Sequence, residues 1–518
     1  MLILCWTILL SVNSVRAVLL RNYAQTTFNF RLANYFQDGM VLLFDEPSSV
    51  LWGYGQPGAK AQVVIFGESV SVDVNDAGIW KTNFWIHILG GPFEIDVYQI
   101  ERGNRTGHIR LRDVYFGEVF LCGGGANMAF PLAKMFNGSE ELASSSQFPR
   151  IRLLRIAPAS SSTEWQEPRI LQNWTVASPD SLKDFSALCW ATGRRVYEDL
   201  RTRFDEKGSI GLIGAYEQAD FPVRSWTPPD SIEQCPGTMP HPANDSGLWN
   251  AMIAPLKELR LTSVIWYQGE ADATINPDTY GCLLQAMVDG WRKHFYHDIA
   301  LPFGIVQLGT RNADTIPGAT ARLRWEQTAG YGQVPNAALV RVFMASAMDL
   351  ADPESPFGSE LPRFKEEIAQ RLLAGIVSVL YYRHIPFQGP FPQRVQLSQD
   401  NVSVYIEYDA KSNFVSDVPN TFEVCCDPLV LRGDSWEDCR VWRNTTSQPD
   451  RSAGNAVVVY TPCGGIAASF LRYAWAATPC GYKRCQVYAT DYLGDARGIP
   501  GPPFVLPTNW TRDGWNVV

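Results

Sequence analysis

Short apolar strands alternate with helices between about residues 114 and 382, and this alternation restricts the possible folds more than any other feature of the sequence. The segments Val119–Cys122, Ser209–Ala215 and Ser263–Tyr267 have the composition of buried strands. Phe185–Leu200 and a stretch that starts near Phe364 have helical patterns. Repeated strand–helix units predict an α/β domain with a parallel sheet covered by helices on both faces. Ligands of such sheets bind beyond the carboxyl ends of the strands.

Two β-rich regions flank this part of the chain. Before it, Val70, Val72 and Val74 alternate with polar residues among many glycines, which predicts a sandwich-like β unit. After it, Val402–Tyr408 and Ala456–Tyr460 have strand patterns in a cysteine-rich region. The sequence therefore predicts three domains: a β-sandwich-like domain at 28–112, an α/β domain at 113–386 and a disulfide-rich β region at 387–518.

Length and composition exclude several classes of protein. A chain of 518 residues is too long for one ordinary domain, and its 46% hydrophobic residues suffice for sizeable cores. The net charge of −9 argues against a nucleic-acid-binding protein, which needs a basic surface. No segment beyond the first residues has the ~18 uninterrupted apolar residues of a membrane span. The sequence leaves the oligomeric state open.

The N-terminus and the glycosylation sequences indicate the secretory pathway. The apolar run Leu2–Val12, with Val15 and Ala17 before a cleavage site, predicts a signal peptide at residues 1–17. A buried N-terminal helix is the alternative. Seven acceptor sequences for N-glycosylation are spread along the chain, at Asn104, Asn137, Asn173, Asn244, Asn401, Asn444 and Asn509. We therefore expect a glycoprotein that is secreted or delivered to the lysosomal lumen.

The cysteines indicate an oxidising compartment as well. Of the 11 cysteines, Cys5 would leave with the signal peptide. Six of the others are clustered late in the chain, at Cys425, Cys426, Cys439, Cys463, Cys480 and Cys485. Six cysteines allow 15 pairings, so the sequence predicts a disulfide framework without its connectivity. Zinc is the weaker alternative, because no paired Cys-x-x-Cys spacing with histidines is present.

A glycine-rich turn follows the first strand of the α/β region. The strand that ends at Cys122 runs into Gly123, Gly124 and Gly125. Glycines permit the strained strand-to-helix turn on which α/β hydrolases present a nucleophile. A phosphate-binding loop is the alternative, but the Gly-Lys-Ser/Thr sequence of such a loop is missing.

A series of short motifs, collinear along the chain, is shared with one enzyme family. The motifs are GEVFLCGGGANM at 117–128, FSALCW at 185–190, LWNAMI at 248–253, VIWYQGE at 264–270, PFG at 302–304, AMDL at 347–350, SPFGS at 355–359 and LRYAW at 471–475. With them the chain resembles the sialate O-acetylesterases, secreted or lysosomal carbohydrate esterases of the SGNH hydrolase type. The first motif is similar to that family's G-[DE]-V-W-L-C-S-G-Q-S-N-M. The resemblance runs from about residue 30 to the end of the chain.

This resemblance implies a fold and a chemistry. It implies that the α/β domain is a flavodoxin-like SGNH-hydrolase sheet, between the β-sandwich-like unit and the Cys-rich β region. It also implies removal of O-acetyl groups from sialic acids by Ser–His catalysis, without a metal or an organic cofactor. An O-acetylated sialic acid or a related glycan is therefore the candidate ligand.

The residues at the catalytic positions of the family pattern are replaced. The nucleophilic serine corresponds to Ala126 and the preceding glutamine to Gly125. The catalytic histidine, in a segment similar to [ST]-I-H-P-R-x-K, corresponds to Leu361. The family's W-G-G-T, which supplies an oxyanion-hole glycine, corresponds to YEQAD at 216–220, which has gained one residue and lost both glycines. In a serine protease, loss of one triad member lowers kcat by up to ~10⁶.

Four polar residues of the family pattern remain and are candidates for ligand binding: Asn127, Gln268, Glu270 and Arg363. Gln268 and Glu270 follow an apolar strand, so we expect them at its carboxyl end, facing Ala126. A satisfied polar network is the alternative interpretation of this pair. Arg363 can bind a sialic acid carboxylate through two parallel hydrogen bonds.

Other residues offer no replacement for the catalytic pair. Asp349 and Asp352 are candidates for the family's acidic orienting residue, but no histidine remains for them to orient. Cys122 is interpreted as a buried structural cysteine rather than a nucleophile, and the six histidines lie outside the matched motif. We therefore expect a catalytically impaired family member that retains glycan binding. The alternatives are an active carbohydrate O-acetylesterase with a displaced nucleophile and a secreted partner-binding scaffold.

Overall fold

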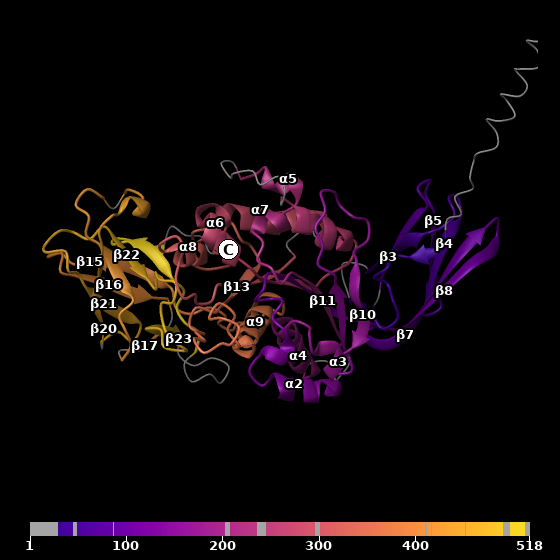
Figure 1. The fold of residues 1–518 in the computed structure, drawn as a ribbon, viewed down its shortest axis with the longest axis horizontal. Helices are drawn as coiled ribbons and strands as arrows, with labels where there is room; N and C mark the ends of the chain where they lie inside the picture. The colour runs from indigo at the N-terminus through magenta and orange to yellow at the C-terminus, as the bar shows by residue number, and fades with distance from the viewer. Residues whose placement is uncertain are drawn as a thin grey trace, which may run out of the picture. The chain divides into compact units, whose positions relative to one another are not determined.

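The computed structural model of the chain is drawn in Figure 1. The residues it describes are 29–44, 49–85, 87–202, 208–235, 245–295, 301–409, 412–415, 417–431, 433–450, 452–489 and 498–512. They form two compact units. Unit one contains Leu51–Thr82, Ile95–Arg110 and the residues up to Ala33, and unit two contains Asn34–Val50, Asn83–Glu94 and Leu111–Val518. The predicted signal peptide lies outside the described residues, and the three-domain division of the sequence stays a prediction.

Strands make up unit one, as its period-two pattern predicts. The strands are β1 (Arg31–Leu32), β3 (Ser49–Tyr54), β4 (Lys60–Ile65), β5 (Glu68–Asp73), β6 (Ile79–Phe84), β7 (Gly90–Glu101) and the first part of β8 (Asn104–Gly124). β4 pairs with β5 and β7 in antiparallel register, and β1, β3 and β6 form a second sheet. Ala61, Val63 and Ile65 alternate with less buried residues along β4. One face of this strand therefore contributes to the core of the unit.

Five parallel strands form the centre of unit two, in the order β11-β8-β12-β13-β14. Besides β8 they are β11 (Ile210–Tyr216), β12 (Ser263–Tyr267), β13 (Phe303–Gln307) and β14 (Val342–Ser346). In chain order this is the flavodoxin-like sequence of strands, so the predicted fold class is confirmed. At one edge, a sixth parallel strand, β9 (Ile151–Ile156), pairs with β11, and β10 (Ile170–Val176) pairs with β9 in antiparallel register. β2 (Val41–Leu43) pairs with β8.

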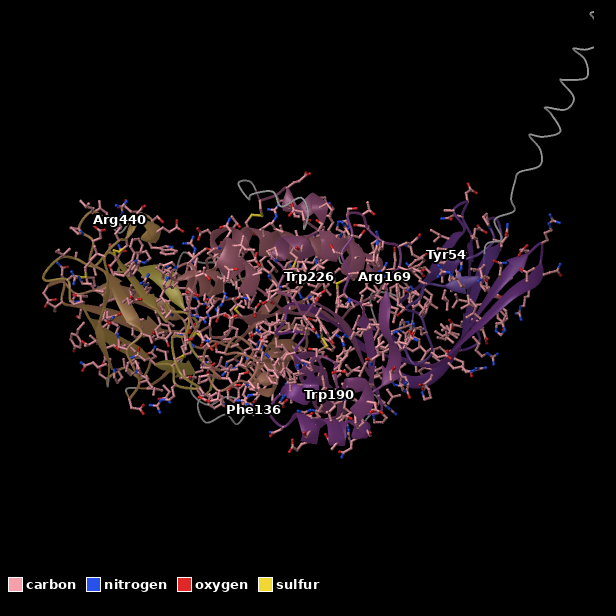
Figure 2. All side chains as sticks on the ribbon, viewed as in Figure 1. Tyr54, Phe136, Arg169, Trp190, Trp226 and Arg440 are labelled. Atoms are coloured by element: carbon pink, nitrogen blue, oxygen red, sulfur yellow. A yellow bond between two sulfur atoms is a disulfide. The ribbon has the colours of Figure 1, made fainter. Side chains whose placement is uncertain are left out.

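Helices cover both faces of this sheet (Figure 1). α4 (Ala187–Arg201) and α9 (Lys365–Val379) pack together on one face, while α7 (Tyr280–His294) packs its Trp291 against Trp266 of β12 on the other. The remaining helices are α2 (Gly138–Ser144), α3 (Pro179–Leu182), α5 (Pro229–Ile232), α6 (Glu270–Ile275) and α8 (Ala319–Glu326). Trp190 and Trp226, labelled in Figure 2, are completely buried. Because both faces are covered, β11, β12, β13 and β14 are buried at every position and mostly apolar.

The C-terminal part of unit two consists of small antiparallel sheets. One contains β15 (Pro392–Leu397), β16 (Ser403–Tyr408), β21 (Ala456–Tyr460) and β20 (Thr446–Pro449). Another contains β19 (Trp442–Asn444), β18 (Phe422–Cys425), β22 (Phe470–Tyr473) and β24 (Phe504–Pro507), and β17 (Ser412–Phe414) pairs with β23 (Val487–Ala489). Ile406, Val424 and Val457 share one buried core. These sheets confirm the predicted Cys-rich β region.

Disulfides join all the cysteines except Cys5, which lies outside the described residues. The pairs are Cys122–Cys189, Cys235–Cys282, Cys425–Cys439, Cys426–Cys463 and Cys480–Cys485. The predicted framework is therefore confirmed, and so is the structural role of Cys122, which links β8 to α4. Within the described ranges, the acidic, histidine and cysteine side chains form no group of three suited to a metal ion. No helix in that part of the chain has the length and apolarity needed to cross a membrane.

Candidate functional site

The candidate site lies where the neighbouring strands β8 and β12 end. Their last residues, Gly124 and Tyr267, are paired, and the Gly125 amide then donates a hydrogen bond to the Tyr267 carbonyl (3.0 Å). Gly124 has a φ of +139°, and a Cβ there would lie 2.0 Å from the Tyr267 oxygen, so only glycine fits. The segments after the two strands thus leave the sheet side by side. Glu270 follows Tyr267 by three residues, and its carboxylate accepts a hydrogen bond from Asn127, the neighbour of Ala126.

A third segment, the loop before α9, joins this edge through Asn127. Asn127 Nδ2 donates to the Glu360 carbonyl (2.8 Å), and Lys365 Nζ donates to Asn127 Oδ1 (2.6 Å). Asn127 follows Ala126 and Glu360 precedes Leu361, so this contact brings together the two positions where the resemblance implies a nucleophile and a base. Neither the alanine methyl group nor the leucine side chain carries an atom that can attack an ester or accept a proton.

The backbone amide of Ala126 already has a hydrogen-bond partner, the carboxylate of Asp220. Asp220 Oδ1 accepts the hydrogen bond of the Ala126 amide (3.1 Å). In serine hydrolases, backbone amides at or next to the nucleophile commonly donate to the oxyanion. A Cβ on Gly125 would lie 2.6 Å from the same Oδ1, so the glycine makes room for the carboxylate. Asp220 lies in the segment 216–220, where the resemblance implies the loss of two glycines, but no sequence motif predicts its contact with Ala126.

Buried charged groups lie behind this turn. Glu270 Oε1 accepts a hydrogen bond from Asn127 Nδ2 (2.6 Å), and Lys365, bonded to the same asparagine, is fully buried. Burial, together with repulsion from Asp220, raises the pKa of Glu270 to about 7. Burial lowers the pKa of Lys365 to about 7, against the opposing effect of Glu270. Both groups therefore change charge near neutral pH.

Gln268 has its side-chain amide engaged within the chain. Its Nε2 donates to the Phe221 carbonyl (2.9 Å) and to Asp272 (2.6 Å), and its Oε1 accepts from the Tyr280 hydroxyl (3.2 Å). Asp272 also accepts from the Val223 amide (3.0 Å), and burial raises its pKa to about 7. These contacts fasten the loop after β11 to the end of β12. The geometry therefore favours the polar network, rather than ligand binding, as the task of Gln268.

Comparisons with known proteins show to which family the chain belongs. The family of sialate O-acetylesterase C-terminal domains matches residues 393–508. Sialate O-acetylesterases from Pongo abelii and Homo sapiens are 32% and 31% identical to this chain, over 92% of it and 92% of each relative. The chain belongs to the sialate O-acetylesterase family. A crystal structure of a carbohydrate acetylesterase from Xanthomonas citri is similar too, with a TM-score of 0.74 at 24% identity over 93% of this chain and 100% of that one.

The arginine that the family motif retains is bound within the chain. Arg363 Nε and Nη2 donate to the two carboxylate oxygens of Asp352 (both 2.8 Å), and the guanidinium lies over the ring of Phe136 (4.2 Å). These bonds hold the pKa of Asp352 below its usual value. A carboxylate on a ligand must therefore compete with Asp352 for Arg363.

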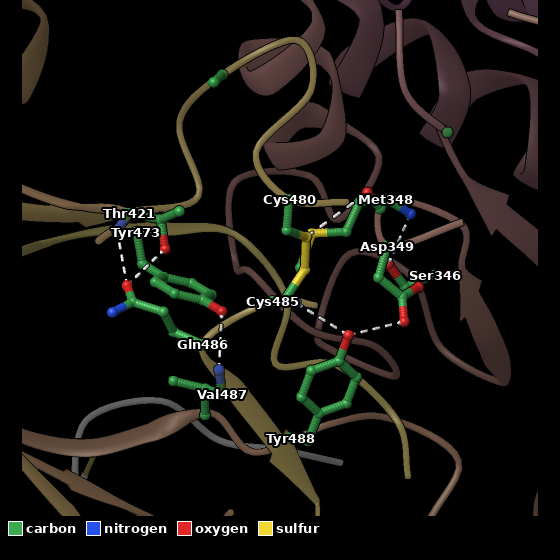
Figure 3. Close-up of a disulfide and its surroundings, with 12 residues drawn as sticks. Ser346, Met348, Asp349, Thr421, Tyr473, Cys480, Cys485, Gln486, Val487 and Tyr488 are labelled. Carbon is green, nitrogen blue, oxygen red and sulfur yellow. Dashed lines mark hydrogen bonds between the residues drawn. A yellow bond between two sulfur atoms is a disulfide. The ribbon is translucent and has the colours of Figure 1, made fainter. Parts of the chain in front are cut away.

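The second candidate for the family's orienting acid is also engaged (Figure 3). Asp349 is completely buried and accepts hydrogen bonds from Arg371 Nη1 and Nη2 (2.6 and 2.9 Å). It also accepts from the hydroxyl of Tyr488 (3.1 Å), next to the Cys480–Cys485 disulfide. Asp349 thus links α9 to the C-terminal sheets. Both acids stabilise loops, and neither is left to orient a histidine.

The histidines that the structure describes do not replace the missing base. His108 bonds to Asp96 in unit one, and His294 bonds to Asp230 on α5. Two more, His87 and His384, are exposed. The remaining two, His241 and His297, lie outside the described residues. The described part of the chain thus places no histidine in a hydrogen bond with the turn around Ala126.

Proposed function

We propose that this chain is a catalytically impaired sialate O-acetylesterase homologue of the secretory pathway that retains glycan binding. The observation that carries the proposal is the state of residue 126: an alanine stands at the nucleophile position, and its amide is bound by the Asp220 carboxylate. Ala126 cannot be acylated, and Leu361 cannot take a proton. The negative charge of Asp220, which is hydrogen-bonded to this amide, opposes the negative charge that develops in a tetrahedral intermediate.

Glycan binding is supported by the family and by the polar groups kept at the site. The relatives are sialate O-acetylesterases, so an O-acetylated sialic acid or a related glycan is the candidate ligand. Asn127 and Glu270 lie at the ends of the central strands, where open α/β sheets bind their ligands. Arg363 precedes Lys365, which bonds to Asn127, by two residues. It stays a candidate for ligand binding if a ligand's carboxylate can take over some of its hydrogen bonds to Asp352.

Entry into the secretory pathway is supported by the disulfides and by the surface. Disulfides persist in oxidising compartments and are rare in the cytosol. The described glycosylation asparagines are exposed at Asn104, Asn137, Asn173, Asn444 and Asn509, and half-buried at Asn401. We propose a secreted or lysosomal glycoprotein on this basis.

Two measurements on the same secreted protein test the proposal. A fluorophosphonate probe labels activated serines, so we expect no labelling, whereas a serine hydrolase in the same tube is labelled. Saturation-transfer NMR with sialosides and amino sugars should detect binding in the millimolar range, about −4 kcal/mol. Site-specific labelling would favour an esterase with a displaced nucleophile. Absence of binding by any glycan would favour the partner-binding scaffold.

A further inference from the structure

The carboxylates around Ala126 differ in how their charge is balanced. Glu360 and Asp352 are each paired with an arginine, at 3.1 and 2.8 Å. Asp220 and Glu270 form no ion pair with any residue in the described ranges. Asp220 is exposed and accepts only the neutral amide of Ala126, while Glu270 accepts only a neutral side-chain amide. Neither of these carboxylates therefore has a cation as a hydrogen-bond partner among the described residues.

The nearby cations of the chain have other partners. Arg311 donates through Nε to Glu360 (3.1 Å) and through Nη1 to the Glu270 carbonyl (3.2 Å). Lys365 donates to Asn127 Oδ1 (2.6 Å) and is fully buried, and it attracts the Glu270 carboxylate without forming an ion pair with it. Over the ranges that the structure describes, no cationic hydrogen-bond donor thus reaches either carboxylate.

One carboxylate oxygen of Glu270 has no partner at all. The side chain is 7% exposed, and its Oε2 is buried without a hydrogen bond to any described residue. Buried polar atoms in folded proteins almost always have partners. Asn127, which binds Glu270 Oε1, directly follows Ala126, whose amide binds Asp220, so the two carboxylates lie beside the same two residues. An acceptor of this kind indicates a ligand that brings a donor.

We infer that Glu270 Oε2 and Asp220 together bind a primary ammonium group, as carried by a glycan with a de-N-acetylated amino sugar. This inference rests on the proposed glycan binding and specifies the ligand's chemistry. An ammonium group has three N–H donors and a positive charge, so it satisfies both carboxylates at once. A neutral hydroxyl supplies one donor and no charge. A sialoside carboxylate must compete with Asp352 for Arg363 and finds the Ala126 amide occupied by Asp220, so we expect sialosides to bind in the millimolar range and more weakly than the amine.

The test compares three ligands that differ in one group. The methyl glycosides of glucosamine, N-acetylglucosamine and glucose are titrated against the full-length glycosylated protein by NMR at neutral pH, with a sialoside as the anionic probe. We expect the amine to bind about ten-fold more tightly than the other two glycosides, the effect of one charge-assisted hydrogen bond. Asp220→Asn and Glu270→Gln should each remove most of this preference. Glu140→Gln, at an exposed position on α2, is the matched control and should keep it.

A second measurement keeps the result interpretable if a variant folds poorly. With wild-type protein, raising the salt concentration from about 20 to about 500 mM should weaken amine binding and leave N-acetyl and hydroxyl binding nearly unchanged. Equal affinities for the three glycosides would overturn the inference while the proposed function stands. The same holds if the amine preference is insensitive to both substitutions. Absence of binding by all four probes would count against the proposed function itself.

Discussion

At the scale of single residues, Gly125 and Asp220 form a matched pair at the candidate site. The carboxylate reaches the Ala126 amide only because residue 125 lacks a Cβ. The resemblance implies that Gly125 replaces a glutamine and that the loop containing Asp220 replaces two glycines, and both positions meet in this one contact. This contact could not be predicted from the sequence, because it joins residues that are 94 positions apart and depends on how a lengthened loop folds.

The pH dependence of stability tests the burial of Glu270. Its pKa is about 7 in the folded chain and ordinarily 4.5. Its contribution to stability is therefore fully present below pH 4.5 and is lost as the pH rises through about 7. Glu270→Gln cannot ionise, so the melting temperature of the variant relative to wild type should be higher at pH 8 than at pH 5. The same difference at both pH values would contradict the buried, ionisable state.

Removal of Asp349 tests the buried ion pair with Arg371. Asp349→Ala leaves a guanidinium buried without its carboxylate, which should lower the free energy of unfolding by about 3–5 kcal/mol. The matched control is Asp73→Ala in the exposed pair with Lys60, where we expect less than about 1 kcal/mol. Urea unfolding measures both. Equal small losses would show that Asp349 is more hydrated than the structure indicates.

At the scale of helices and strands, buried apolar runs made the sheet predictable. Ser263–Tyr267 is a strand with the expected bounds, and the helix expected near Phe364 begins at Lys365. Trp249, Met252 and Ile253 recur at helical spacing, but Trp249–Ile253 forms a π-helical turn, followed by a 3₁₀ turn that contains Pro255. A proline has no N–H to continue an α-helix. The periodicity of apolar residues does not distinguish these turns from an α-helix.

Two disulfides that close loops of very different length allow the effect of loop length on stability to be measured. Cys122–Cys189 closes a loop of 67 residues within the core, whereas Cys480–Cys485 spans 5. Because the entropy removed from the unfolded chain grows with loop length, Cys122→Ala/Cys189→Ala should cost about 3–4 kcal/mol, more than Cys480→Ala/Cys485→Ala. Chemical unfolding of the two double variants measures the difference. A larger loss for the short loop would mean that packing at Cys480, rather than chain entropy, dominates.

At the scale of the whole molecule, the sequence was most informative about family and fold. Motifs spread from the glycine turn to Leu471–Tyr473 follow the family order, and the flavodoxin-like strand order agrees with them. The number and clustering of the cysteines predicted disulfides, but which cysteines pair could be seen only in the folded structure. The polar partners of Gln268 and Arg363 were also beyond the sequence, because a motif does not show whether a retained side chain is free or bound.

Processing of the secreted protein tests its route through the cell. The N-terminal sequence of secreted material should begin after Ala17, and treatment with an N-glycosidase should lower its mass. Both results follow from the predicted signal peptide and from the exposure of asparagines such as Asn104 and Asn509. Asn401, which is half-buried, is expected to be modified least. An unprocessed, unglycosylated chain would place the protein in another compartment.

Acetate release from an O-acetylated sialoside tests the central claim most directly. Wild-type protein should release acetate no faster than heat-denatured protein, and Ala126→Ser should not change this, because Leu361 provides no base. Ala126→Ser/Leu361→His/Asp220→Gly, which supplies nucleophile and base and frees the amide, is the variant in which we expect turnover above that background. Turnover by purified wild-type protein that rises with its concentration and persists in Ala126→Gly would contradict the account.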